Sequence, residues 1–148
     1  MNAVATVRPI NKGDEAQWRR MWAAYLDFYK VELPQAHADK LFASLMKGEP
    51  YFGFIAEQDG KPVGFVHGLP HPSTWSQTGY CYLEDLYVDA EARGGGAGRA
   101  LIKAVHEEAK NRSLSRVYWH TDKGNETARK LYDKVATLSD FVHYRMDV

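Results

Sequence analysis

The residues from Ala92 to Arg99 read Ala-Arg-Gly-Gly-Gly-Ala-Gly-Arg, a glycine turn with an arginine near each end. The turn follows an expected strand and opens an expected helix, so several backbone N–H groups converge with no Cβ atoms in the way. The start of the helix adds about half a positive charge, and the two arginines add full ones. We therefore predict a pyrophosphate site made by Arg93, Gly94, Gly95, Gly96, Ala97, Gly98 and Arg99.

The spacing of these glycines excludes two nucleotide-binding motifs. The phosphate loop requires Gly-Lys-Ser or Gly-Lys-Thr, whereas Gly98 is followed by Arg99-Ala100. The dinucleotide motif GxGxxG also fails, because counting from Gly94 reaches Arg99 and counting from Gly96 reaches Leu101. The pyrophosphate must belong to another kind of ligand.

The pattern Arg-x-x-Gly-x-Gly at Arg93, Gly96 and Gly98 resembles the coenzyme A signature of the GCN5-related N-acetyltransferases, the GNAT family. The resemblance extends upstream through Tyr82-Leu83-Glu84-Asp85-Leu86-Tyr87-Val88 and downstream from Asn125 to Tyr132, about the C-terminal half. The upstream run is most similar to the branch of spermidine/spermine and fungal histone and polyamine acetyltransferases. The resemblance implies direct transfer of acetyl from the thioester of acetyl-coenzyme A to a primary amine. We expect that amine to be a polyamine, an amino acid or its analogue, or a lysine side chain in a protein.

The resemblance also implies which residues hold the donor. The glycine turn would bind its pyrophosphate, and the strand before it would pair with the pantetheine arm as an added strand does. Asn125 would hold pantetheine from the facing helix. The donor-binding residues outside the turn are then Leu86, Tyr87, Val88, Asn125 and Ala128.

Direct transfer requires two proton movements. An alkylammonium with a pKa near 10.4 must lose a proton, at a cost of about 4.6 kcal/mol at pH 7. The matching glutamate is the base in the polyamine branch, which implies that Glu84 is the general base, acting through a water. A phenol with a pKa near 10 suits protonation of the leaving thiolate, and the resemblance implies Tyr132. Tyr132 also fits an ordinary core stripe with Ala128 and Val135.

Asp85 follows Glu84, and the two side chains of a regular strand would point to opposite faces. Members of the family have a bulge here, which would turn both carboxylates to the cleft and let Asp85 hold the cationic group of the substrate. Without a bulge they are two strand carboxylates. Further candidates for a cation pocket, each of which fits a core role equally well, are Tyr25, Tyr29, Glu32, Trp75 and Tyr80.

Composition and the remaining reactive residues exclude several other classes. Nineteen basic and nineteen acidic residues balance, so no overall positive field favours nucleic acid. No apolar run reaches the roughly 20 residues that cross a bilayer, and no signal peptide is recognised. The single cysteine, Cys81, fits a buried strand position in a reducing cytoplasm, and we expect no metal site, because Pro70 and Pro72 prevent a helix that would join His67 and His71.

The elements that must position these residues form one domain over residues 1–148. We expect strands at 6–10, 51–57, 62–69, 80–88, 116–121 and 141–146, with a hairpin at Asp59-Gly60 and a loop at 71–79. Helices are expected from Asp14, before Gly48, after the glycine turn and from Asn125. The order β-α-α-β-β-β-α-β-α-β predicts an α/β fold with a mixed sheet, the GNAT fold.

The C-terminus departs from the family pattern, because Val135-Ala136-Thr137-Leu138 stands where a Gly-Phe is usual. About ten residues remain, enough for one strand where the fold has two. A strand shared with a second copy would complete the sheet, and related polyamine and histone acetyltransferases are dimers, so we expect a homodimer. The alternative functions are a non-catalytic acyl-coenzyme A sensor or scaffold and a nucleotide-binding enzyme.

Overall fold

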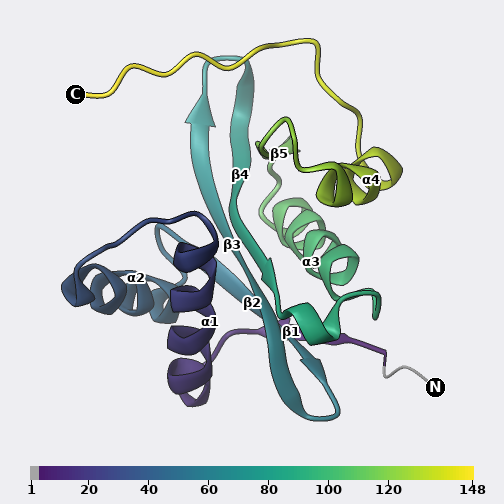
Figure 1. Cartoon of the computed structure of the whole chain (residues 1–148). Coiled ribbons are helices and arrows are strands. Elements are labelled where there is room, and N and C mark those ends of the chain that lie inside the picture. Colours follow the sequence, from purple (N-terminus) through teal and green to yellow (C-terminus); the bar gives the residue numbers. More distant parts are fainter. Residues whose placement is uncertain (1–3) are drawn as a thin grey trace.

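The computed structural model describes residues 4–148 as a sheet with helices on both faces (Figure 1). The five strands lie in the order β1-β2-β3-β4-β5, and only β4 and β5 run parallel. This mixed sheet confirms the predicted fold class. The elements are β1 (Thr6–Pro9), α1 (Glu15–Phe28), α2 (Gln35–Lys47), β2 (Phe52–Gln58), β3 (Lys61–Ser73), β4 (Ser76–Val88), α3 (Ala97–Asn111), β5 (Val117–Tyr118) and α4 (Glu126–Val135), with short 3-10 turns at Lys12–Asp14 and Ala90–Ala92.

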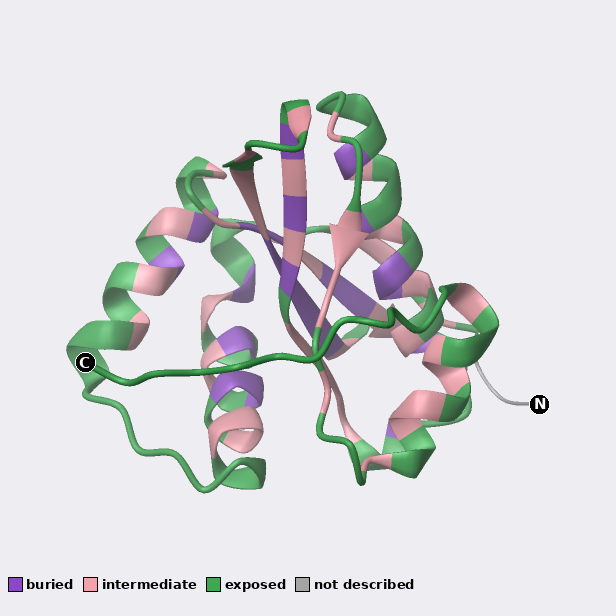
Figure 2. Cartoon of the chain, turned by 90° about the horizontal axis from the view of Figure 1, so that it is seen from above, coloured by how far each residue is buried: buried purple, intermediate pink, exposed green. Residues whose placement is uncertain are grey.

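The sheet separates two hydrophobic cores (Figure 2). Helices α1 and α2 cover one face, where Trp18, Met21 and Phe42 pack on Ile55 and Phe65 of the central strands. Helices α3 and α4 cover the other face, over a core that includes the α3 residues Leu101, Ile102 and Val105. A side chain of the sheet therefore belongs to the α1 side or to the α3 side.

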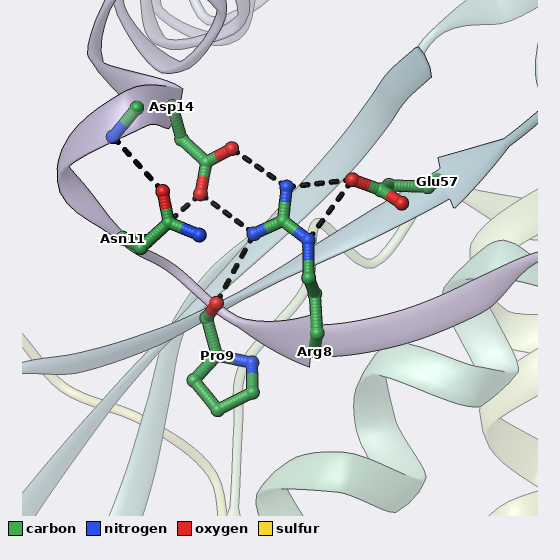
Figure 3. A network of polar contacts seen from close by, with 6 residues as sticks. Arg8, Pro9, Asn11, Asp14 and Glu57 are labelled. Atoms are coloured by element: carbon green, nitrogen blue, oxygen red, sulfur yellow. Dashed lines mark hydrogen bonds and ion pairs between the residues drawn. The ribbon is translucent and has the colours of Figure 1, made fainter. Parts of the chain in front are cut away.

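Arg8 joins the edge strand β1 to strand β2 and to the turn that precedes α1 (Figure 3). Its guanidinium donates to both carboxylate oxygens of Asp14 at 2.8 Å and to Glu57 Oε1 at 2.6 and 2.9 Å. Asp14 also accepts from the backbone N–H of Asn11 at 2.8 Å, which closes a capping box before α1. These bonds fix where α1 starts relative to the sheet.

The two hairpins differ in how well the sequence predicts them. Asp59 and Gly60 adopt φ angles of 53° and 75° between β2 and β3, which confirms the tight turn. The loop expected at 71–79 is wrong, because β3 and β4 stay paired as far as Ser73 and Ser76. The prolines of this stretch are tolerated because β3 has already lost its pairing with β2, which ends at Gly68.

The strand expected at 141–146 is also wrong. Residues 136–148 form no strand and follow α4 as an extended stretch, which Figure 1 shows leading to the opposite side of the molecule. The expected strand at 116–121 shrinks to Val117–Tyr118, so the sheet offers only a short edge for further pairing. Large apolar side chains are left exposed along the stretch at Leu138, Phe141, Val142, Tyr144 and Met146.

Candidate functional site

The glycine turn has the backbone that an anion site requires. Gly94 and Gly96 have φ angles of 90° and 82°, a region that other residues enter at a cost, and a Cβ atom on either would face open space. Helix α3 begins at Ala97, and no side chain caps it. The first intrahelical bond is donated by Ala100, so the N–H groups of the residues just before it have no helical acceptor. The turn therefore fits a pyrophosphate.

Beside the turn, β4 leaves one backbone edge without a strand neighbour. The pairs between β4 and β5 are limited to Cys81 with Val117 and Tyr82 with Tyr118. From Leu83 to Val88, β4 is paired with β3 on its other side but with no described strand on this one. An extended pantetheine arm can use this edge, which includes the predicted residues Leu86, Tyr87 and Val88.

Asn125 stands at the start of α4, which follows β5 along the chain. Its side-chain oxygen accepts from the backbone N–H of Ala128 at 3.2 Å, as the predicted cap requires. The Asn125 amide nitrogen remains as a donor for a ligand, whereas the Ala128 N–H is already used. The donor contact predicted for Ala128 would therefore have to be made by its methyl group.

A bulge in β4 brings the two acidic residues to one face. Asp85 pairs with His67 of β3 and Leu83 pairs with the next residue, Gly68, so Glu84 has no partner in the ladder. The alternation of faces changes at this point: Cys81 and Leu83 lie in the α3-side core before it, and Leu86 and Val88 after it. Asp85 consequently faces the α1 side, where His67 hydrogen-bonds its carboxylate. The expected bulge is thus present.

The surroundings of Glu84 raise the pKa of its carboxyl group. Partial burial and the charge of Asp85 raise the pKa of Glu84 above its usual value, although a hydrogen bond with Tyr82 acts in the opposite direction. Burial, and after it the charge of Glu84, raises the pKa of Tyr82 to about 12. Tyr82 also contacts His120 Nδ1 at 3.2 Å through its hydroxyl.

A group of tyrosines surrounds the two carboxylates. Burial is the main cause that raises the pKa of Tyr25, followed by the charge of Asp85 and a hydrogen bond with it. Burial and then Asp85 likewise raise the pKa of Tyr29. Tyr25 of α1 and Tyr29, which follows the last residue of α1, are thus close enough to Asp85 for its charge to raise their pKa. Further tyrosines whose pKa is raised by burial and by the charge of Glu84 were missed from the sequence: Tyr51 and Tyr118.

Tyr132 lies between α4 and the sheet, packed against the α3-side core, with Trp119 at a ring distance of 5.4 Å. Burial, and secondarily the neighbouring Tyr29, raises the pKa of its hydroxyl. The phenol therefore holds its proton throughout the neutral range, as a general acid must.

The other predicted residues differ in their distance from this group, and Tyr80 is next to one of its members, with 6.3 Å between its ring centre and that of Tyr118. Trp75 is at the tip of the β3–β4 hairpin, 74% exposed and nine residues before Glu84, about 30 Å along an extended strand. Glu32 is exposed in the α1–α2 loop. Tyr80 packs under the guanidinium of Arg116, 4.5 Å from its ring centre. Burial raises the pKa of the Cys81 thiol to about 11, which is unsuitable for a nucleophile.

The sequence matches the Acetyltransferase (GNAT) family over residues 18–136, which is most of the chain. The chain belongs to the GNAT family. This GNAT acetyltransferase is 35% identical over 148 residues to the D-amino-acid N-acetyltransferase HPA3 of Saccharomyces cerevisiae, covering 98% of this chain and 92% of that protein. It is 28% identical to the thialysine N-epsilon-acetyltransferase of Caenorhabditis elegans, over 74% of this chain and 68% of that one.

The fold agrees with solved acetyltransferase structures. The aminoglycoside N-acetyltransferase AAC(6')-Iy in complex with CoA superposes with a TM-score of 0.83 at 18% identity, covering 99% of this chain and 97% of that one. The GNAT acetyltransferase described here therefore moves acetyl from acetyl-coenzyme A to an amine, and the glycine turn fits that donor. None of the helices in the part of the chain that the structure describes is long and apolar enough to cross a membrane.

Proposed function

We propose that this acetyltransferase acetylates the primary amine of a small cationic molecule, with Glu84 as general base and Tyr132 as general acid. The observation that supports this most is the bulge at Glu84, which leaves it without a ladder partner and turns Asp85 to the α1 side. Two carboxylates beside tyrosine hydroxyls form a site that attracts an ammonium group.

Glu84 is the base because its raised pKa brings it closer to the working pH than an ordinary glutamate. It takes a proton from the bound ammonium, directly or through a water. The free amine then attacks the thioester carbon, and the C–S bond breaks. The departing thiolate takes its proton from Tyr132, whose pKa is raised and which is therefore protonated at the start of the step. The nitrogen, positively charged after the attack, releases its remaining extra proton to solvent as the amide forms, and the Tyr132 phenolate takes a proton back from solvent.

Asp85 holds the charge of the substrate, with Tyr25 and Tyr29 on the α1 wall of the pocket. Burial and Asp85 raise the pKa of both tyrosines, so their hydroxyls stay neutral and can line a cation site. Two relatives named for small amine acceptors, D-amino acids and thialysine, support an acceptor with an amino acid skeleton. Such a substrate is smaller than the protein lysine that the sequence also allowed.

A panel of amines tests the proposal. Thiol release from acetyl-coenzyme A is measured with D-amino acids, thialysine, spermidine and a lysine-containing peptide at equal concentrations. We expect the highest kcat/KM with one of the three small amines and little turnover of the peptide. A clear preference for the peptide would overturn the small-molecule assignment. Tight donor binding without release by any amine would favour an acyl-coenzyme A sensor.

We also propose that the chain works as a homodimer through residues 136–148. Phe141, Tyr144 and Met146 are 79%, 89% and 90% exposed in the single chain, an unusual cost in water for three large apolar side chains. The edge of β5 next to this stretch is short and has no second neighbour among the described strands. A second copy would supply both a cover for the apolar residues and a partner for the edge.

A further inference from the structure

His67 is a buried polar residue at the centre of the α1-side core. It is 1% exposed, and its ring stacks on Phe65 with 4.6 Å between ring centres. Both ring nitrogens have partners: Nδ1 is 2.9 Å from Asp85 Oδ2, and Nε2 is 3.0 Å from the indole nitrogen of Trp18. A histidine so placed is a link between the helix α1 and the acidic strand.

The partners determine which nitrogen of His67 carries the proton. An indole N–H can only donate, so Nε2 must accept from Trp18 and has no hydrogen of its own. The proton is then on Nδ1, where it is donated to the Asp85 carboxylate. Trp18 is fully buried, which makes the loss of its acceptor costly and fixes this tautomer.

The register of the sheet places the hydrogen bond between His67 and Asp85 directly beside the bulge in β4. His67 pairs with Asp85 across β3 and β4, and the irregularity lies between His67 and Gly68. Asp85 Oδ2 is engaged by His67, and the carboxylate is 13% exposed, so its second oxygen can be reached by Tyr25 or by a ligand. Tyr25 also interacts with this carboxylate, and Glu84 repels it. A carboxylate with several neighbours needs a strong, fixed donor to keep one orientation.

We propose that Trp18 and His67 form a positioning relay that holds the Asp85 carboxylate with one oxygen facing the amine of the substrate. The inference rests on the proposed role of Asp85 in binding that amine. His67 touches neither the acceptor nor the donor. It acts through Asp85, and the chain of bonds runs from the indole N–H to the imidazole and from the imidazole to the carboxylate.

Two substitutions separate a relay from simple packing. His67→Leu fits the apolar surroundings of the ring but cannot donate to Asp85 and leaves the Trp18 N–H without its acceptor. His67→Asn is polar and can donate from an atom near Nδ1. A relay predicts that His67→Leu raises the amine KM by about 10- to 100-fold, the effect of a lost bond to a charged group, and that His67→Asn recovers most of this loss. The KM for acetyl-coenzyme A should stay within about twofold in both. A packing role predicts the reverse order, with the leucine variant the better enzyme.

A double-mutant cycle with Asp85→Asn tests whether the effect passes through Asp85. We expect His67→Leu to have little further effect on the amine KM once Asp85 is replaced. If Asp85→Asn alone leaves the amine KM unchanged, the proposed amine-binding role of Asp85 is wrong. If Asp85→Asn raises it and His67→Leu does not, the relay is wrong and the amine-binding role stands.

Nitrogen NMR of the unmodified full chain gives a readout that does not depend on activity. The signals of the His67 ring nitrogens are assigned as those that are missing from the spectrum of His67→Asn. They should show a protonated Nδ1 and an unprotonated Nε2. A proton on Nε2 would contradict donation to Asp85 and overturn the relay.

Discussion

Gly98 and Leu131 touch so closely that a Cβ atom on the glycine would lie 3.3 Å from the leucine Cδ2. The contact joins the first turn of α3, which ends the anion site, to the middle of α4. Leu131 precedes Tyr132 in the same helix, so the contact joins the proposed pyrophosphate site to the helix of the proposed acid.

Tyr132→Phe tests the general acid. The variant keeps the ring in its packing against Trp119 but removes the proton. We expect kcat to fall by about 100-fold or more, the usual contribution of a general acid, with unchanged affinity for acetyl-coenzyme A. Steady-state kinetics and calorimetry measure the two quantities. Tyr144→Phe, at an exposed tyrosine, is the matched control, and normal turnover of Tyr132→Phe would disprove the role.

Gly96→Ala tests the turn as the donor site. An alanine at this φ of 82° strains the backbone by about 1–2 kcal/mol, and its methyl group enters the space open to the ligand. Gly60→Ala is the matched control, because Gly60 has a φ of 75°, open space and a place in the β2–β3 hairpin. Both variants should lose similar stability in urea. Only Gly96→Ala should bind acetyl-coenzyme A more weakly, and equal affinities in the two would argue against the site.

The pH profile tests Glu84. A base must be ionised, so kcat/KM should rise with pH through the pKa of Glu84, which is raised above 4.5 by burial and then by Asp85. In Glu84→Gln this limb should vanish, and the rate should instead follow deprotonation of the amine, about tenfold per pH unit towards a pKa near 10.4. Glu107→Gln, on the exposed side of α3, should behave as the native chain. A native profile in Glu84→Gln would rule out its role as base.

Acid should destabilise the protein partly through Asp14. Burial alone would raise the pKa of Asp14, but hydrogen bonds from Arg8 and from the Asn11 backbone outweigh it and lower the pKa below 3.8. This stabilisation is complete above the unfolded pKa and is lost as the pH falls through the lower folded value, so the loss begins below about pH 4.

Asp14→Asn should cost about 1–3 kcal/mol at pH 7 and flatten the acid limb of the stability curve, measured by urea unfolding. The control is Asp39→Asn, which breaks the exposed pair with Arg19 and should cost clearly less stability, because water and salt screen an exposed ion pair. Equal losses in the two variants would show that burial of Asp14 has no special effect.

The homodimer is tested by light scattering. The full chain should have twice the chain mass at micromolar concentration, and a chain ending at Val135 should have the mass of one copy. A monomeric full chain would remove the proposal. Replacing Phe141 and Met146 by serine offers a milder disruption, because both are exposed in the single chain and lie outside the described helices and strands.

Sequence reasoning succeeds where one residue type serves one local purpose. The glycines of the turn, the Asp59-Gly60 hairpin, the cap by Asn125 and the end of α2 at Gly48 all depend on local backbone preferences. The bulge was expected from the resemblance, since nothing in an alternating strand shows where a ladder slips.

The missed features depend on pairing between distant segments. The sequence relates His67 only to His71, as a possible pair of metal ligands, because one sequence cannot show that β3 places His67 opposite Asp85. The predictions of a loop around Trp75 and of a last strand are wrong for the same reason, since strand formation depends on a neighbouring strand as much as on composition. Tyr82 could have been found, because it stands two residues before Glu84 and shares its face.

Two residue pairs attach β5 to β4, and α4 follows β5 as the carrier of Tyr132. The segment that holds the proposed acid is thus joined to the sheet ladder by these two pairs, although α4 also packs on the α3-side core. A donor lying along the free edge of β4 would add contacts between this segment and the sheet. The acid would then be held more firmly while a thioester is present, and hydrogen exchange in α4 would slow when the donor binds.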